Sequence, residues 1–319
     1  MKTLLITFLL ASTIPAQQHP PEPPPMHPIK SEQSPVKTFT VTHEGKTIHQ
    51  ITADDVALPY LDGMWLEMDK YNKFQEEVAS QVFRKPVDAK IGTGGRIEPA
   101  KPGRELDREQ FNHQFASYFY AGEISKAETP LRVVHPRVDE ELLASIRERK
   151  IGQYVTYYNQ SNKERSKNIA LAAEAIDNHV VFPSETFSFN GVVGKRTKEK
   201  GYLPAPVIVK GELAEDIGGG ICQISSTLYN AADQAGVKII ERYSHSRRVP
   251  YVPPGRDATV SWYGPDFSFE NDYNQPILIR ARAVNGRVLI NIFSSETIEN
   301  QERKVPEADT EPPKEVPAE

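Results

Sequence analysis

The sequence predicts an α+β fold, in which a small N-terminal α+β module precedes a mixed α+β domain that ends in a β-hairpin. Residues 37–52 have the pattern strand, turn, strand, with Glu44-Gly45 at the turn. Apolar residues at helical spacing recur in residues 66–83 and 165–178. Near the C-terminal end, Asn285-Gly286 separates two alternating segments, which is a strong hairpin signal.

The folded part of the chain is long enough for two domains rather than one. The first is expected at residues 36–149, with a hairpin at 37–52, a helix at 66–83, a strand at 87–91, a helix from Asp107, a strand at 131–134 and a helix at 139–149. The second is expected at residues 150–295, with a strand at 151–158, a helix at 165–178, a strand at 201–209, a helix from about Cys222 to Gly236 and a hairpin at 275–293.

Both ends of the chain are expected to lie outside these domains. Residues 1–16 have the charged start, apolar stretch and small last residue of a signal peptide, so we expect a secreted, extracellular protein. Residues 17–35 form a Pro-rich linker, and residues 296–319 an acidic, Pro-rich tail expected to be disordered. The apolar stretch is shorter than the roughly 20 residues that span a bilayer, so no integral membrane segment is expected after signal removal.

Composition excludes several classes of protein. The formal net charge is −5, and no basic block with interleaved aromatic residues occurs, so nucleic acid is not an expected partner. The chain has one cysteine and no Cys/His cluster, which excludes an internal disulfide and argues against structural zinc. We therefore expect neither a metal nor another cofactor.

The lone cysteine, Cys222, follows three glycines and precedes Ser225, Ser226 and Thr227, which favour helix starts. At a helix N-terminus, the exposed amides and the helix dipole lower a thiol pKa from its free value of about 8.5. The backbone of Gly219 and Gly220 could aim amide donors at an oxyanion. A catalytic nucleophile is one interpretation; a small buried residue beside a glycine turn is the other, because free cysteine is commonly buried.

Further candidates lie after the cysteine. His245 is the candidate base, with Asp257 or Ser246 to orient its ring, although an exposed histidine in a basic loop remains an alternative. His179 is a weaker candidate. Arg247 and Arg256 are candidate substrate-binding residues because guanidinium groups bind carboxylates in a bidentate manner, and Ser225 joins them.

Several long segments occur in an order and spacing that resemble the VanW family. They include Asn178–Asn190, Gly201–Val209, the Gly-Gly-Gly-Ile-Cys-Gln motif, and the segment with His245-Ser-Arg, and the resemblance covers about Lys150 to Phe293. Residues 66–149, with Gly94-Gly-Arg-Ile-Glu-Pro, resemble a peptidoglycan-binding module that often precedes VanW domains. A structural module without a ligand is an equal alternative there, because similarity of fold does not supply a binding site.

The resemblance implies a secreted cell-wall protein associated with glycopeptide (vancomycin) resistance. For members with this cysteine it implies an L,D-transpeptidase-like activity on peptidoglycan stem peptides, with Cys222 as the nucleophile that forms a thioester and His245 as the matching histidine. With water as acceptor the same site would be a carboxypeptidase. The alternative from another class is a non-catalytic peptidoglycan-binding accessory protein, in which Cys222 only packs.

Overall fold

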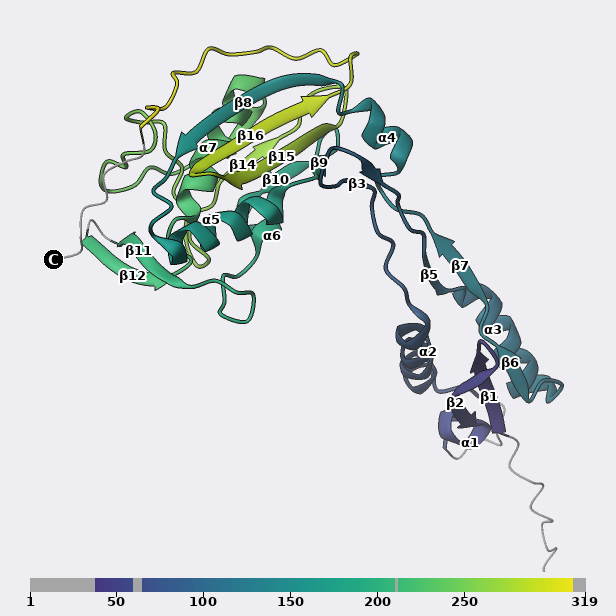
Figure 1. Ribbon diagram of the computed structural model, residues 1–319. Coiled ribbons are helices and arrows are strands. Elements are labelled where there is room, and N and C mark those ends of the chain that lie inside the picture. The colour runs from purple at the N-terminus through teal and green to yellow at the C-terminus, as the bar shows by residue number, and fades with distance from the viewer. Residues whose placement is uncertain (1–37, 60–64, 210–211, 312–319) are drawn as a thin grey trace, which may run out of the picture.

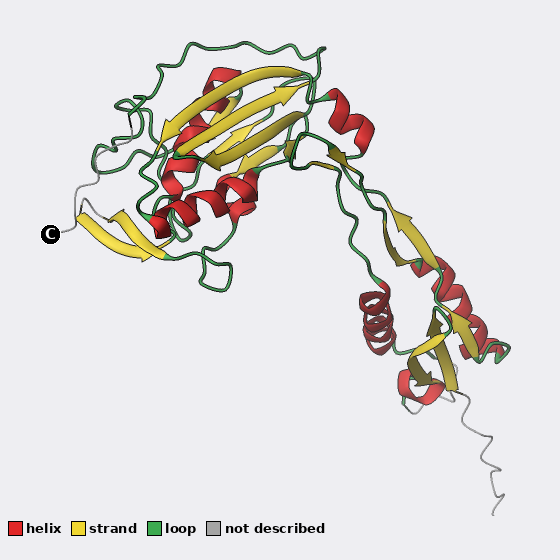
Figure 2. Ribbon diagram, viewed as in Figure 1, coloured by secondary structure: helices red, strands yellow, loops and turns green. Residues whose placement is uncertain are grey.

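The computed structural model describes residues 38–59, 65–209 and 212–311. The expected signal peptide and the Pro-rich linker lie outside these ranges. Within them the fold is α+β, as predicted, with a small N-terminal lobe and a larger C-terminal lobe joined by long extended segments (Figures 1 and 2). None of the helices in these ranges is both long and apolar enough to cross a membrane.

The N-terminal lobe packs helices against a small sheet of order β2-β1-β6. The predicted first hairpin is confirmed by β1 and β2, and β6 joins β1 in parallel. The core is aromatic, with Phe39 at its centre. The elements are β1 (Thr38–His43), β2 (Lys46–Thr52), α1 (Ala53–Val56), α2 (Met68–Val82), α3 (Arg108–Ala116), the π-helix η1 (Ser117–Ala121) and β6 (Lys126–Glu128).

Short strands connect the two lobes. They pair as β3 with β4 and as β5 with β7, and α4 follows them. Leu143 and Ile146 pack with Val180 and Leu278 of the larger lobe, so this connecting region shares a core with it. The elements are β3 (Lys90–Ile91), β4 (Ile97–Glu98), β5 (Gly103–Leu106), β7 (Leu131–Val134) and α4 (Glu140–Ser145).

The C-terminal lobe is built on a four-stranded antiparallel sheet of order β8-β16-β15-β9, with α5 and α7 packed on it (Figure 1). The predicted last hairpin is confirmed: β15 and β16 pair around Asn285 and Gly286, which both have positive φ. Sheet strands and packed helices are β8 (Arg149–Tyr157), β9 (His179–Val181), β15 (Ile277–Val284), β16 (Arg287–Ser294), α5 (Lys163–Ile176) and α7 (Ile221–Ala235).

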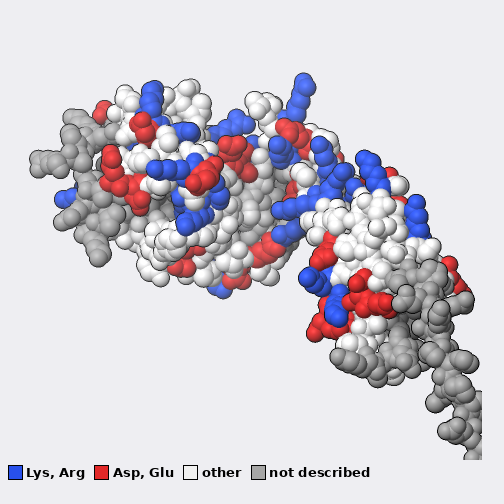
Figure 3. Space-filling view, turned by 90° about the horizontal axis from the view of Figure 1, so that it is seen from below, with Lys and Arg blue, Asp and Glu red and all other residues white. Residues whose placement is uncertain are grey.

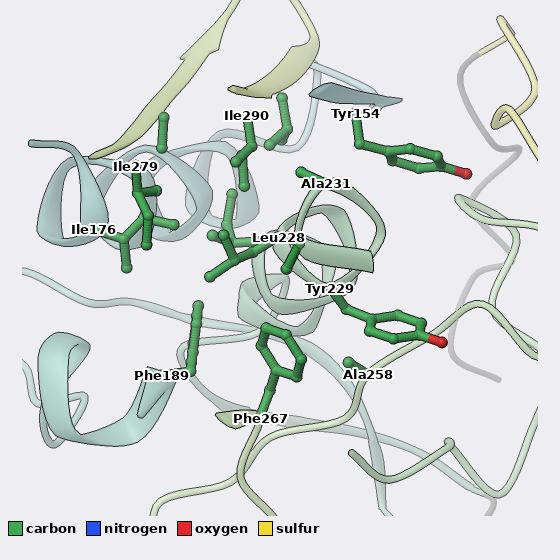
Figure 4. Close-up of a cluster of buried hydrophobic side chains, with 14 of the residues drawn as sticks. Tyr154, Ile176, Phe189, Leu228, Tyr229, Ala231, Ala258, Phe267, Ile279 and Ile290 are labelled. Atoms are coloured by element: carbon green, nitrogen blue, oxygen red, sulfur yellow. The ribbon is translucent and has the colours of Figure 1, made fainter. Parts of the chain in front are cut away.

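Smaller elements surround this sheet. A second sheet has the order β10-β14-β13, and β11 pairs with β12 as a separate hairpin. They are β10 (Thr186–Ser188), α6 (Phe189–Val193), β11 (Pro204–Val209), β12 (Glu212–Ile217), β13 (Lys238–Glu241) and β14 (Ser268–Glu270). Leu228 and Ala231 of α7 lie in the apolar core with Ile279 and Ile290 of the sheet (Figure 4), which fixes the helix that carries Cys222.

The C-terminal segment differs from the expected disordered tail as far as residue 311. Val305 and Ala308 pack against the core, and the Tyr154 hydroxyl donates a hydrogen bond of 2.8 Å to the Pro306 carbonyl. Arg303 also forms an ion pair with Asp233. A few anchoring side chains therefore hold a segment whose composition alone predicts disorder.

Surface charge does not mark a functional site on the face that Figure 3 shows. Basic and acidic side chains are mixed there, and the basic ones gather where the two lobes join. A site in the larger lobe must therefore be sought from its chemistry, at the start of α7.

Candidate active site

Glycines place Cys222 in the first turn of α7. Gly220 precedes the helix with φ of 101°, a left-handed conformation that favours glycine. A Cβ atom on Gly219 would lie 2.4 Å from the carbonyl oxygen of Ala205, so no side chain fits between this turn and β11. Cys222 therefore lies at a helix start, as predicted.

The helix begins earlier than its serines suggested, because Gly220 and not a serine precedes its first residue. Ser225 and Ser226 lie inside α7 and are fully buried. The Ser225 hydroxyl donates to the Ala258 carbonyl at 2.6 Å, and the Ser226 hydroxyl accepts from the Ala258 amide at 2.8 Å. Ser225 thus holds the segment around Ala258 against the helix. This contact was not predicted from the sequence, which suggested Ser225 for substrate binding.

That segment carries the carboxylate that orients His245. One oxygen of Asp257 accepts hydrogen bonds of 2.6 Å from both the backbone amide and the Nδ1 atom of His245. Both side chains are buried, with 6% and 10% of their area exposed. Of the two orienting residues considered from the sequence, the structure therefore brings Asp257 to the imidazole, while Ser246 is exposed.

The Cys222 thiol and the His245 imidazole shift each other's pKa. Burial opposes ionisation of Cys222, but the hydrogen bond and charge of His245 hold the thiol pKa below its ordinary value. Burial also opposes protonation of His245, yet Cys222 and Asp257 together raise its pKa. Because Nδ1 is bonded to Asp257, Nε2 is the ring nitrogen left to face the sulfur. The arrangement favours a thiolate–imidazolium ion pair.

The segment after Asp257 completes the surroundings of the sulfur. The Sγ atom lies 3.8 Å from the Thr259 hydroxyl and 3.5 Å from the Val260 carbonyl oxygen. Cys222 as a whole residue is partly exposed. Thr259 and Val260 were missed from the sequence, because no motif indicates that a loop this far along the chain turns back over the helix start.

The backbone donors differ in their availability. The Gly219 amide donates to the Asp216 carbonyl at 3.3 Å. None of the hydrogen bonds described for residues 38–59, 65–209 and 212–311 uses the amide of Gly220 or of Cys222. The amides at positions 220 and 222 are therefore more available than that of Gly219 as donors to an oxyanion.

The structure does not bring every candidate to the thiol. Arg256 donates to Asn230 at 2.7 Å and to Asp233 at 2.7 Å, so its guanidinium is already engaged within the protein. Arg247 is exposed, and the described residues offer it neither a hydrogen bond nor an ion pair. His179 lies on β9, with its ring 5.3 Å from that of Phe187.

Another arginine, Arg196, is electrostatically coupled to Cys222 although sequence reasoning did not select it. It follows α6, and its Cβ and Cγ atoms cover Gly218. No group of three or more potential metal ligands occurs in the part of the chain that the structure describes. The cysteine, histidine, aspartate and nearby cation together form a site suited to nucleophilic chemistry on an acyl group.

The fold and site therefore define an α+β protein with a Cys-His-Asp arrangement at the start of a buried helix. Residues 164–293, which contain this arrangement, match the family model described as VanW like protein. The chain is 53% identical to "Uncharacterized protein YoaR" of Bacillus subtilis (strain 168), covering 91% of this chain and 96% of the relative. The chain belongs to the VanW-like family.

A more distant relative carries a descriptive name. "Vancomycin B-type resistance protein VanW" of Enterococcus faecalis (strain ATCC 700802 / V583) is 28% identical over 40% of this chain and 48% of its own length. No solved structure matches the chain. The described geometry is thus the main basis for a mechanism.

Proposed function

We propose that this protein is a secreted, cell-wall-associated cysteine enzyme with L,D-transpeptidase-like activity on peptidoglycan stem peptides. The observation that carries the proposal is the arrangement of Cys222, His245 and Asp257, in which the aspartate holds Nδ1 and the imidazole lowers the pKa of the thiol. Such an arrangement activates a nucleophile without any metal. The name of the Enterococcus relative supports a connection with the cell wall and glycopeptide resistance.

In the acylation step, the thiol proton passes to Nε2 of His245, and the Cys222 thiolate attacks the carbonyl carbon of the third stem residue. The Sγ–C bond forms and the carbonyl oxygen becomes an oxyanion, which the backbone amide of Cys222 is proposed to stabilise at the helix start. The C–N bond to the terminal D-alanine then breaks, and the proton on His245 passes to the departing amine. A thioester on Cys222 remains.

In the second step, an amine from a neighbouring stem attacks the thioester carbon. His245 accepts a proton from that amine, the C–S bond breaks, and the proton returns to the thiolate. The new amide is a cross-link that needs no D-alanyl-D-alanine donor, which would connect the activity to glycopeptide resistance. Attack by water instead gives a shortened stem and a carboxypeptidase.

The test is incubation of the mature protein with disaccharide-tetrapeptide, followed by liquid chromatography and mass spectrometry of the products. We expect cross-linked dimers from the wild type and none from Cys222→Ala or His245→Ala. His113→Ala is the matched control, because His113 is exposed in the N-terminal lobe. Shortened monomers alone would indicate a carboxypeptidase. Unchanged substrate with a folded wild type that binds peptidoglycan would replace the proposal by the non-catalytic accessory protein.

A further inference from the structure

Arg196 has an unusual environment for a cation. Both terminal nitrogens, Nη1 and Nη2, are buried and have no hydrogen-bond partner among the described residues. Burial lowers the pKa of this guanidinium, but an arginine remains charged at any physiological pH. A buried charge without a partner carries a large desolvation penalty, so its presence calls for an explanation.

The neighbours of Arg196 do not supply that partner. Asp266 is close enough to interact electrostatically, but its oxygens accept from the Ser188 hydroxyl at 2.5 Å and from the Asn190 amide at 2.9 Å. The guanidinium carbon lies 5.7 Å from the centre of the Phe189 ring, a cation–π contact that attracts the charge but gives the terminal nitrogens no hydrogen-bond acceptor. Donors of Arg196 therefore remain for a ligand.

The position of Arg196 relates these donors to the reacting sulfur. Its Cβ and Cγ atoms lie 3.3 Å from where a Cβ of Gly218 would be, in the glycine turn that leads into Cys222. Charge on the sulfur and on the guanidinium interact. Arg196 as a whole is only partly buried, and a role in binding would require rotation about its side-chain bonds to turn the nitrogens toward a ligand beside the thiol.

The substrate of the proposed reaction has a group that fits. In a tetrapeptide stem, the carboxylate of the terminal D-alanine is separated from the scissile carbonyl carbon only by one nitrogen and one Cα atom. A guanidinium has parallel donors that bind a carboxylate through two hydrogen bonds. We propose that Arg196 binds the free terminal carboxylate of the residue that leaves, and thereby restricts the enzyme to the end of the stem.

This proposal rests on the function proposed above, in that it concerns the same site and substrate. It assigns to Arg196 the specificity role that the sequence suggested for Arg247 and Arg256. An enzyme that recognises the terminal carboxylate at this distance would reject a pentapeptide stem. Its carboxylate lies one residue further from the same carbonyl. The substrate is then a stem already trimmed to four residues, which is the product of a D,D-carboxypeptidase class of reaction.

The test compares disaccharide-tetrapeptide with the same compound carrying a terminal D-alaninamide. We expect wild-type kcat/KM to be on the order of 100-fold higher for the carboxylate, as for a desolvated charge pair. Arg196→Gln should bring the ratio of the two kcat/KM values close to one, whatever its absolute rate, and Arg196→Lys should retain part of the preference. Lys198→Gln is the control, because Lys198 is an exposed cation of the same loop.

A binding measurement separates this inference from the catalytic proposal. Calorimetry with Cys222→Ala should show tighter binding of the carboxylate compound than of the amide, and Cys222→Ala/Arg196→Gln should bind both equally, whether or not the wild type turns over either. Equal binding of the two compounds by Cys222→Ala, no binding of either, or a preference that persists without Arg196 would overturn the assignment. Circular dichroism verifies that each variant is folded.

Discussion

The two lobes have interiors of different kinds. In the N-terminal lobe, the Phe39 ring contacts Phe74, Phe111, Phe115 and Tyr118, so the core consists largely of aromatic rings. In the C-terminal lobe, α7 also buries Gln223, Ser225, Ser226, Thr227 and Asn230, and their side chains are hydrogen-bonded. Apolar burial is non-directional, whereas hydrogen bonds fix distance and angle. The hydrogen-bonded side of α7 is therefore where the geometry of a site can be set.

The largest effect is expected in the C-terminal lobe, where substitution of Asp257 should reduce activity. In Asp257→Asn, the neutral amide has no charge to stabilise the imidazolium, and its oxygen is a weaker acceptor for the two His245 N–H groups than a carboxylate oxygen. We expect kcat to fall by roughly 10²- to 10⁴-fold, as for the orienting carboxylate of a catalytic triad. Product formation from disaccharide-tetrapeptide measures this, with Asp272→Asn as a control at an exposed carboxylate. Full activity in Asp257→Asn would mean that the aspartate is dispensable.

The next largest effect is expected on the stability of the N-terminal lobe, through its aromatic core. Phe39 is fully buried, so Phe39→Ala should destabilise the N-terminal lobe by about 3–5 kcal/mol through lost burial and a cavity. Hydrogen exchange at the lobe's amides is the measurement. The rate of alkylation of Cys222 should not change, and Phe83→Ala should have little effect, because Phe83 is 53% exposed. A large change in thiol reactivity would show that the lobes are coupled.

The smallest effect is expected from substitution of a buried serine of α7, which should lower both stability and activity. Ser226→Ala leaves the buried Ala258 amide without its acceptor, which should cost about 1–3 kcal/mol in the free energy of unfolding. Because Ala258 follows Asp257, we expect activity to fall as well, unlike in Phe39→Ala. Urea unfolding and product assays measure the two quantities. Ser80→Ala serves as the control at an exposed helical serine, and unchanged activity in folded Ser226→Ala would separate the helix from the site.

Local signals account for the features that could be predicted from the sequence. Asn285-Gly286 specifies its hairpin because both residues adopt positive φ readily, and the glycines before Cys222 indicate a close-packed turn into a helix. The α+β class follows from such signals as well. Cys222 and His245 could be singled out because reactive residue types occur in motifs of recognisable spacing.

Tertiary features could not be predicted in this way. Asp257 was one of two orienting residues considered from the sequence, but no local pattern specifies the path by which the loop after β13 returns to α7 through the bonds of Ala258 and brings it to His245. Arg256 and Arg196 are the same residue type in the sequence, yet one is bonded to Asp233 and the other lacks a partner for its terminal nitrogens. Whether an arginine is structural or free depends on its neighbours in space.

The most direct test of an activated nucleophile is the rate of Cys222 alkylation as a function of pH. The hydrogen bond and charge of His245 lower the thiol pKa, so deprotonation should be complete at lower pH than for a free thiol, whose pKa is about 8.5. We predict that the rate rises and reaches its plateau below that pH in the wild type, and that the midpoint moves upward in His245→Ala. A midpoint at the free-thiol value in both proteins, or a folded wild type whose thiol does not react, would contradict an ion pair between Cys222 and His245.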